Sequence, residues 1–401
     1  MTTARLSAVL TAIALLGSPA LGAEKSCRPD EAGRIPAANP CLRLTGRALV
    51  AGPRDGFAAP GALVFDRPGI VLEVRFTGTS FALELAAENA HVELCVDGKC
   101  ARERLAGPMR EVRVAEGLPS GEHLFRLRKR SETIRSQVEA GRIRIDPGAL
   151  LLEARKPAAR RIEIIGDSYT VGYGVESWSK SDSSKQDESG RECDEAKLQA
   201  TTNTFAAQGW IAAELLGADA QVNAFSGLGL VRAYNGDTTW LPYPEYYGRV
   251  LQNRAEPAYD PARPPFGEPW KPQAVVVALG TNDFSTELQP HESKRFADRA
   301  ALRAAWKKAY AEFLARLRKL YPGARFVLVS TNLATGNELA DGVRDIVADE
   351  AKAGRKDLVA VDLPSLTQWG CHWHPDLATQ RANGRRLAET ISKLMGWPLA
   401  D

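Results

Sequence analysis

Four short blocks along the chain contain residue types that could together carry out acyl transfer. They hold, in chain order, a serine, a glycine, an asparagine and a histidine: Gly166-Asp167-Ser168-Tyr169-Thr170, Ser226-Gly227-Leu228-Gly229-Leu230, Gly280-Thr281-Asn282-Asp283 and Gly370-Cys371-His372-Trp373-His374-Pro375. A serine hydroxyl becomes a nucleophile when a histidine accepts its proton, and N–H groups stabilise the oxyanion that forms. Each block alone has a simpler explanation, such as a helix cap or a turn. Their joint occurrence predicts a serine-dependent acyl-transfer site.

The elements that must position these blocks are strands alternating with helices. Beyond residue 158, apolar segments typical of strands (162–165, 222–225, 274–279, 326–330 and 358–361) alternate with helical stretches (204–216, 300–320 and 378–394). This alternation predicts a mostly parallel sheet covered on both faces. Ligands bind such sheets beyond the carboxyl ends of the strands, and the four blocks lie after strands.

On these blocks the sequence resembles the SGNH (GDSL-type) hydrolase superfamily, whose signature residues are Ser168, Gly227, Asn282 and His374 in this numbering. The extended block 165–174, together with the β-rich N-terminal part, is more narrowly similar to carbohydrate esterase family 2. The resemblance implies a flavodoxin-like three-layer α/β/α domain. It also implies Ser168 as nucleophile, His374 as base, and an oxyanion hole made by the backbone N–H groups of Ser168 and Gly227 and the Asn282 amide. Losing one such donor typically costs about 10²–10³ in rate.

The chain departs from the superfamily pattern beside the histidine. Most members carry an aspartate three residues before the histidine, and many similar esterases carry it two residues before. Those positions are Cys371 and His372 here. A Ser-His dyad whose histidine is oriented by a backbone carbonyl is the simplest interpretation, and a carboxylate from Asp362 or Asp376 is the alternative.

The N-terminal part has a different periodicity. Between residues 41 and 145, segments such as 71–76, 80–85, 91–96 and 123–127 mostly alternate apolar with polar residues. Period-two alternation broken by turn residues predicts antiparallel strands, here a jelly-roll-like β-sandwich. The length of 401 residues favours two or three domains. With the link at 157–160, we expect a β domain over residues 24–157 and a catalytic domain over residues 158–401.

The first residues have the layout of a secretory signal peptide. Arg5 is followed by an apolar run over 8–16, a Gly17-Ser18-Pro19 break and a small-residue cleavage region ending at Ala23. The run is too short to span a bilayer, so we expect residues 1–23 to be removed and the mature protein to be secreted or periplasmic.

Six cysteines remain after this cleavage, an even number that favours disulfides in an exported chain. Cys95 and Cys100 flank an Asp97-Gly98 hairpin signal, so their sulfurs can face each other. Proximity and elimination then pair Cys27 with Cys41 and Cys193 with Cys371. The last bridge would anchor the histidine loop to the insertion at 177–202 and could replace the orienting role of the missing aspartate. Zinc is disfavoured because no Cys-x-x-Cys or close His/Cys spacing occurs.

Composition excludes several classes of protein. A hydrophobic content of 44% and a net charge of +3 are those of a globular soluble protein, not of a disordered or multi-span membrane protein. The basic cluster Arg126, Arg128, Lys129 and Arg130 partly alternates with apolar residues, and we expect it on the solvated face of a strand. No nucleic-acid-binding motif accompanies it, so no nucleic-acid partner is expected.

The family resemblance also suggests a substrate. It implies removal of acetyl groups from polysaccharides such as xylan or glucomannan, without metal or cofactor, by a protein that we expect to be a monomer. Trp373, Asp167, Tyr169 and Trp240 are the candidate substrate-binding residues. The other aromatic residues of the insertion at 236–270, up to Trp270, either stack on sugar or pack in the core. The alternatives are an O-acyltransferase that uses the same acyl-enzyme and a non-catalytic carbohydrate-binding protein.

Overall fold

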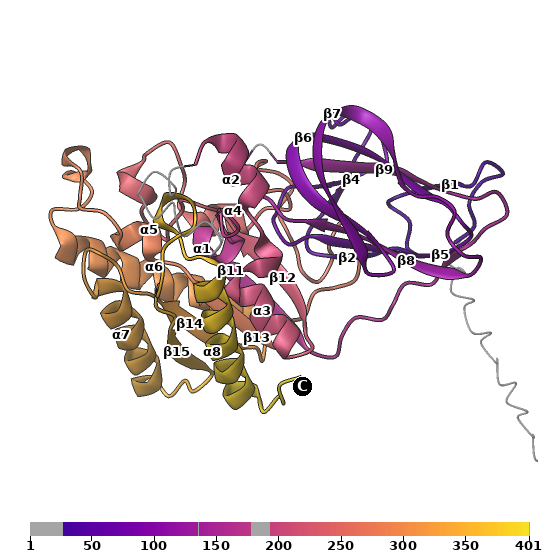
Figure 1. Cartoon of the computed structure of the whole chain (residues 1–401). Coiled ribbons are helices and arrows are strands. Elements are labelled where there is room, and N and C mark those ends of the chain that lie inside the picture. The colour runs from indigo at the N-terminus through magenta and orange to yellow at the C-terminus, as the bar shows by residue number, and fades with distance from the viewer. Residues whose placement is uncertain (1–26, 135, 178–192, 401) are drawn as a thin grey trace, which may run out of the picture.

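The computed structural model describes residues 27–134, 136–177 and 193–400. Strands β1–β10 form one part of the molecule, and β11–β15 with their helices form the other (Figure 1). The expected signal peptide, residues 1–23, lies outside the described residues. We propose that the division between the two domains falls at 157/158, in the segment that separates β10 from β11.

The N-terminal part is an antiparallel sheet in which ten strands are described. Its strands are β1 (Arg34–Pro36), β2 (Arg43–Thr45), β3 (Leu49–Val50), β4 (Leu63–Phe65), β5 (Val71–Thr77), β6 (Phe81–Val96), β7 (Lys99–Ala115), β8 (Glu122–Lys129), β9 (Val138–Ile145) and β10 (Leu151–Leu152). The main order is β10-β5-β8-β6-β9-β4-β3, with β1 on β9, β2 on β5 and β7 on β6. The predicted antiparallel β domain is confirmed.

Strand β6 makes this sheet curl. Its first half pairs with β9 and its second half with β8, and its pairing shifts register at several points between Leu83 and Ala90. Such bulges bend a strand and increase its twist. The curled sheet encloses a core that includes Phe65, Phe76, Phe81 and Phe125, all fully buried.

The hairpin between β6 and β7 agrees with its sequence signal. Asp97 and Gly98 both have positive φ, 50° and 82°, which is the conformation of a type I′ turn. Cys95 and Cys100 face each other across the two strands and form a disulfide. The other predicted pairs, Cys27–Cys41 and Cys193–Cys371, are also bonded. All three predicted disulfides are therefore confirmed.

The second part is built on a parallel five-stranded sheet. Its strands are β11 (Arg161–Gly166), β12 (Asp219–Ala224), β13 (Ala274–Ala278), β14 (Arg325–Ser330) and β15 (Leu358–Asp362), in the order β12-β11-β13-β14-β15. This is the flavodoxin-like order, in which the chain direction across the sheet reverses beside the first strand. The predicted α/β fold is confirmed.

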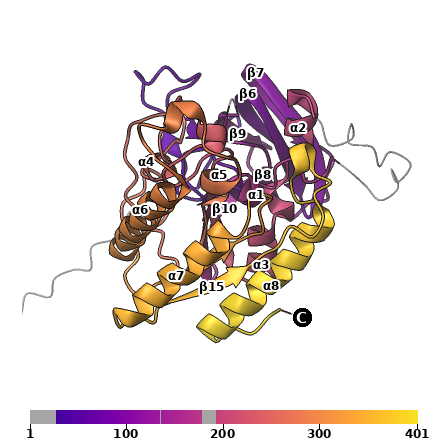
Figure 2. The same cartoon turned by 90° about the vertical axis from the view of Figure 1, so that its left-hand side faces the viewer.

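Helices cover both faces of this sheet (Figure 2). The helices are α1 (Ser168–Val171), α2 (Glu195–Thr201), α3 (Gln208–Leu215), α4 (Tyr243–Tyr247), α5 (Thr281–Phe284), α6 (Arg299–Leu320), α7 (Glu338–Lys352) and α8 (Leu377–Met395), with 3-10 turns η3 (Thr204–Ala206), η4 (Tyr234–Gly236), η5 (Pro290–Glu292) and η6 (Cys371–Trp373). Residues of α4, α6 and α7 pack on one face, and residues of α3 and α8 pack on the other. The predicted helix 204–216 is two elements, since the chain is extended at Ala207.

Buried polar contacts join the two parts. The Arg47 guanidinium of the N-terminal part lies 3.2 Å from the Glu163 carboxylate on β11, and both side chains are fully buried. Glu163 also accepts hydrogen bonds from Asn223 and Tyr247. Arg67 donates to the backbone carbonyl of Arg249 at 2.8 Å. Because a buried charge without a partner is costly, these contacts favour one fixed arrangement of the two parts.

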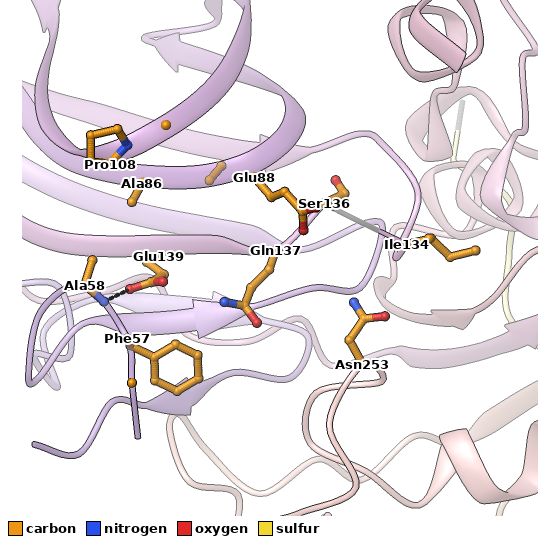
Figure 3. A pocket seen from close by; sticks show the side chains of 13 residues that line it. Phe57, Ala58, Ala86, Glu88, Pro108, Ile134, Ser136, Gln137, Glu139 and Asn253 are labelled. Carbon is orange, nitrogen blue, oxygen red and sulfur yellow. Dashed lines mark hydrogen bonds between the residues drawn. The ribbon is translucent and has the colours of Figure 1, made fainter. Parts of the chain in front are cut away.

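A cavity lies where strands of the N-terminal part meet residue 253 of the second part (Figure 3). Its volume is about 650 Å³, and Phe57, Glu88, Gln137, Glu139 and Asn253 are among its lining residues. Small residues of β6 and β7, such as Ala86 and Gly107, also line it. Because its lining contains neither Ser168 nor His374, this cavity is separate from the predicted catalytic pair.

The basic cluster contradicts one expectation. Arg126 and Arg128 are partly exposed and pair with Glu73 and Glu93. Lys129 and Arg130, however, are 0% and 1% exposed. Lys129 ends β8 on the buried face that it shares with Phe125 and Leu127. Arg130 follows the strand, where its carbonyl accepts the Thr204 hydroxyl of the second part. The prediction of a solvated face was therefore wrong for this pair.

The described residues contain neither a membrane-spanning helix nor a metal-binding cluster. Within this part of the chain, no helix combines the length and apolar character needed to cross a membrane. Nor do its His, Cys, Asp and Glu side chains form a group of three or more suited to holding a metal ion.

Candidate active site

Ser168 lies at the tight turn between β11 and α1. The Asp167 carboxylate accepts the backbone N–H of Tyr169 at 3.1 Å and so caps the short helix that begins at Ser168. The helix ends after one turn at Gly172, which has a left-handed φ of 72°. This turn at the carboxyl end of the sheet directs the serine hydroxyl toward the loop that follows β15.

His374 contacts Ser168 directly. Its Nε2 lies 2.8 Å from the Ser168 Oγ, and its Nδ1 lies 2.9 Å from the Cys371 carbonyl and 3.1 Å from the His372 carbonyl. A carbonyl can only accept, so Nδ1 must carry the proton of a neutral ring. The lone pair of Nε2 therefore faces the serine, whose hydroxyl donates. This is the tautomer that a general base requires.

The carboxylates considered from the sequence are engaged elsewhere. Asp362 accepts the Ser330 hydroxyl. Asp376 caps α8 through the Thr379 backbone N–H at 2.9 Å and also accepts the Thr367 hydroxyl. Backbone carbonyls, not either aspartate, thus hold the His374 ring in this structure.

The turn that supplies these carbonyls has an uncommon backbone. His372 and Trp373 have φ values of 50° and 59°, a left-handed conformation that costs non-glycine residues roughly 1–3 kcal/mol each. Several contacts hold the turn in place. Cys371 is bonded to Cys193, and the Cys193 N–H donates to His372 Nε2 at 3.4 Å, so His372 Nδ1 carries the proton that it donates to the Tyr173 oxygen at 2.8 Å.

Tyr173 connects the serine block to the histidine loop. Its ring stacks on the His374 ring with centroids 4.3 Å apart and planes at 30°. The next residue, Gly174, has a φ of +54°, and a Cβ there would lie 2.3 Å from the Cys371 Cβ. A glycine is therefore required for this close approach, because any side chain would push the histidine loop away from the serine.

Asn282 and Gly227 lie at the neighbouring strand ends. Asn282 is the second residue of α5, after β13, and its amide donates to the Leu228 carbonyl at 3.0 Å. Gly227 follows β12 with a φ of +80°, a conformation that glycine adopts without strain. Asp283 accepts the N–H groups of Leu230, Val231 and Arg232 at 2.8–2.9 Å and holds this loop against α5. The Gly227 loop and Asn282 are thus brought together beside the serine turn.

Family comparisons agree with this arrangement. Residues 164–394 match the GDSL-like Lipase/Acylhydrolase family, and residues 52–154 match the Carbohydrate esterase 2 N-terminal family. The chain belongs to the GDSL-like lipase/acylhydrolases, as a family 2 carbohydrate esterase. It is therefore a carboxylic ester hydrolase.

Two curated relatives of this chain are named as esterases. An acetylxylan esterase / glucomannan deacetylase of Cellvibrio japonicus is 35% identical over 339 residues, which are 83% of this chain and 86% of that protein. A cellulase/esterase CelE of Acetivibrio thermocellus is 30% identical over 94% of this chain and 41% of its own length.

A solved structure supports the same relationship. A family two carbohydrate esterase from Clostridium thermocellum, in complex with cellohexaose, superposes with a TM-score of 0.74 at 26% identity, over 89% of this chain and 99% of that chain.

The four candidate substrate-binding residues of the esterase lie in different surroundings. Trp373, 42% exposed, directly precedes His374, and Tyr169 packs edge-on against the His374 ring at 5.4 Å. Trp240, 36% exposed, contacts Phe225, which directly precedes the Gly227 loop. Asp167 is 1% exposed and serves as a helix cap. Their contact with substrate stays a prediction, and Asp167 is the one placed away from the surface.

Most aromatic residues of the insertion pack inward, which is the core alternative and not the stacking one. Tyr243, Tyr246 and Tyr247 are at most 7% exposed and pack against α6 and the sheet. Trp270 donates to the buried Glu163 at 2.6 Å. The rings look alike in sequence, but the short helix α4 turns these tyrosines inward, and Trp240 remains at the surface.

Two aromatic residues near the site were missed by sequence reasoning. Tyr173 lies in the extended block 165–174, but only the fold shows that its ring stacks on that of His374. Tyr234 is 56% exposed, and its N–H donates to the Gly227 carbonyl at 2.8 Å. Tyr234 follows the Gly227 block by a few residues, and this position in the sequence could have indicated that it lies near the site.

The esterase should stay active in mild acid. Burial lowers the pKa of His374 to about 4, although its hydrogen bonds to the two carbonyls act in the opposite direction. A base works when neutral, so activity is retained above this pKa and lost as the pH falls through it. We expect kcat/KM for an acetyl ester at about pH 5.5 to be close to its value at about pH 7.5.

An acidic limb of kcat/KM between about pH 6 and 7 would contradict this expectation. Burial raises the pKa of Asp167 to about 7, so this capping residue is the rival source of such a limb. The Asp167→Asn variant separates the two, because it would abolish a limb caused by Asp167 and leave one caused by His374.

Removing the Cys193–Cys371 bridge should lower activity. The bridge fixes Cys371, whose carbonyl holds His374. In a Cys193→Ser/Cys371→Ser variant we expect kcat to fall about 10-fold, since small misplacements of a catalytic group are costly. Thermal unfolding should show a stability loss of about 2–4 kcal/mol. The Cys95→Ser/Cys100→Ser variant, which removes the hairpin bridge, is the matched control, and equal kcat in the two variants would refute the orienting role.

Proposed function

We propose that this chain is an exported serine esterase that removes O-acetyl groups from a polysaccharide of the xylan or glucomannan type. The observation that carries the proposal is the 2.8 Å contact between Ser168 Oγ and the unprotonated Nε2 of His374. The relatives named as acetylxylan esterase / glucomannan deacetylase support the substrate class. Export through residues 1–23 and a monomeric state remain part of this proposal.

The first half-reaction acetylates the serine. His374 Nε2 accepts the Ser168 hydroxyl proton while Oγ bonds to the acetyl carbonyl carbon. The tetrahedral intermediate then expels the sugar oxygen, which takes the proton from His374. The products are an acetyl ester on Ser168 and a free sugar hydroxyl.

The second half-reaction releases acetate. His374 accepts a proton from water, the water oxygen bonds to the acetyl carbon, and Ser168 leaves with the proton that His374 returns. The Cys371 and His372 carbonyls help here because they stabilise the protonated ring twice in each cycle.

The proposed oxyanion donors are the backbone N–H groups of Ser168 and Gly227 and the Asn282 side-chain amide. Their effect depends on fixed positions, because preorganised donors need no rearrangement as charge develops. The bond of Asn282 to the Leu228 carbonyl and the three N–H groups held by Asp283 supply this rigidity.

Exposed aromatic rings would bind the sugar chain. Trp373 and Trp240 are exposed on the histidine loop and beside the Gly227 loop, and the ring of Tyr169 lies against His374. Apolar sugar faces can pack on such rings, whereas a neutral glycan needs no charged partner.

Acetate release from acetylated xylan, acetylated glucomannan and acetylated cell-wall glycans, measured side by side, tests this function. The proposal expects free acetate from the first two and no acetylated acceptor sugar. Acetyl groups recovered on a sugar acceptor would instead indicate an O-acyltransferase. Binding without release of acetate would indicate a carbohydrate-binding protein.

A further inference from the structure

A buried segment of the N-terminal part reaches the active-site loops of the second part. Segment 129–133, which begins at the last residue of β8, contains Lys129, Arg130, Ser131, Glu132 and Thr133, all at most 3% exposed. Polar residues are seldom buried in a row unless each has partners. The partners of this segment show where it is directed.

Lys129 fixes the shape of the segment from within. Its ammonium donates to the Ser131 carbonyl at 3.0 Å and to the Glu132 carbonyl at 2.6 Å. These contacts close a tight loop, and the Ser131 and Ser136 hydroxyls lie 2.8 Å apart across its base. The Glu132 side chain is therefore presented from a rigid loop.

The outer residues of the segment attach it to both sides of the site. The Arg130 carbonyl accepts the Thr204 N–H and hydroxyl, and the same Thr204 hydroxyl donates to Val171 at the end of α1. On the other side, the Thr133 hydroxyl lies 2.8 Å from Gln252 and 3.3 Å from the Ala224 carbonyl, where β12 ends. The loop is thus clamped between the serine turn and the Gly227 loop.

Glu132 contacts the residue next to a proposed oxyanion donor. Its Oε1 accepts the hydroxyl of Ser226, the residue directly before Gly227. Burial raises the pKa of Glu132 to about 7, with the Ser226 hydrogen bond and the Lys129 charge acting in the opposite direction. This hydrogen bond crosses from one part of the molecule to the other and fixes the peptide whose N–H is the proposed oxyanion donor.

We propose that Glu132 is a positioning residue of the esterase: by holding Ser226, it keeps the Gly227 N–H aimed at the developing oxyanion. The inference rests on the proposed function, and it gives the N-terminal part a role in catalysis. Glu132 acts through Ser226 and does not itself touch the acetyl group.

Steady-state kinetics on an acetyl ester can test this role. In Glu132→Ala we expect kcat to fall about 10- to 100-fold, less than the roughly 10²–10³ for deleting an oxyanion donor, since the N–H is displaced and not removed. KM should stay within about 2-fold because the contact matters in the transition state. Glu132→Gln retains an acceptor oxygen and should recover most of the kcat.

A double-mutant cycle separates positioning from general stability. Ser226→Ala should lose as much kcat as Glu132→Ala, and the double variant should lose no more than either, because both remove the same contact. The Arg43→Gln variant is the control, since Arg43 bridges the two parts at Asp219, the opposite end of β12, and its kcat should be unchanged. Thermal unfolding of each variant shows whether it is folded, and Ser226→Ala carries the test if Glu132→Ala does not fold.

The inference is overturned if Glu132→Ala or Ser226→Ala keeps more than half of the wild-type kcat, or if their losses multiply in the double variant. These outcomes differ from failure of the proposed function, in which the wild-type protein itself would show no Ser168-dependent ester hydrolysis.

Discussion

Replacing Ser168 with alanine is expected to lower kcat for an acetyl ester by about 10⁴- to 10⁶-fold, the range for loss of a serine nucleophile. Without Oγ no acetyl-enzyme can form, and only binding and the oxyanion donors remain to accelerate attack by water. The fold should persist, because the change removes a single hydroxyl. The measurement is hydrolysis of p-nitrophenyl acetate together with acetate release from acetylated polysaccharide.

Ser365→Ala is the matched control for this variant. Ser365 lies near the same turn, with its hydroxyl 3.5 Å from that of Tyr169, and its loss should leave kcat nearly unchanged. Full activity of Ser168→Ala would show that the assignment of the nucleophile is wrong. Unchanged binding of an oligosaccharide by Ser168→Ala would show that its loss of activity is chemical.

Replacing His374 with alanine should have an effect of similar size, about 10⁴- to 10⁶-fold in kcat. Ser168 would then lack the acceptor that lies 2.8 Å from its hydroxyl. Because the two residues act as a unit, the Ser168→Ala/His374→Ala double variant should be no less active than Ser168→Ala alone. Kinetics of the three variants, measured on one substrate, check this expectation.

Asp362→Asn is the control that distinguishes a dyad from a triad. Backbone carbonyls hold His374 Nδ1, whereas Asp362 accepts the Ser330 hydroxyl. We expect Asp362→Asn to retain wild-type kcat. A loss on the scale of His374→Ala would mean that this carboxylate, and not the carbonyls, orients the base.

Much of the candidate site was predictable because it depends on local sequence and on one rule of topology. The carboxyl ends of parallel strands share one edge of the sheet, so residues placed after β11, β12 and β13 had to lie near one another. The Asp97-Gly98 turn likewise fixed the pairing of Cys95 with Cys100. The dyad alternative also followed from local sequence, since His372 and Cys371 occupy the positions of the usual aspartate.

What sequence could not show depends on contacts between distant segments. Glu132 and Ser226 are 94 residues apart, and neither periodicity nor a motif connects them. The burial of Arg130 has the same origin, because the chain leaves the β8 strand pattern there, whereas Lys129 continues the buried face of β8. Tyr243 and Tyr247 stayed undecided between core and surface, because an aromatic residue in a long insertion gives no sign of which way a short helix will turn it.

The N-terminal part is then more than a stabilising addition. Its Arg47 reaches the buried Glu163 on β11, and its Glu132 reaches the Gly227 loop. The first contact is buried in the second part, and the second lies beside its proposed oxyanion donor. We therefore propose that the N-terminal part helps to position the catalytic site of the second part.

Mass spectrometry can detect an acetyl-enzyme on Ser168 directly. The enzyme is mixed with an acetyl ester and quenched with acid within milliseconds to seconds. An acyl-enzyme on Ser168 predicts a single added acetyl group on the peptide that contains Ser168. This group should disappear as substrate is exhausted and be absent in Ser168→Ala. An acetyl group on another residue would contradict the proposed acyl-enzyme. So would steady turnover by saturated enzyme if early quenching never captures an acetyl group on Ser168.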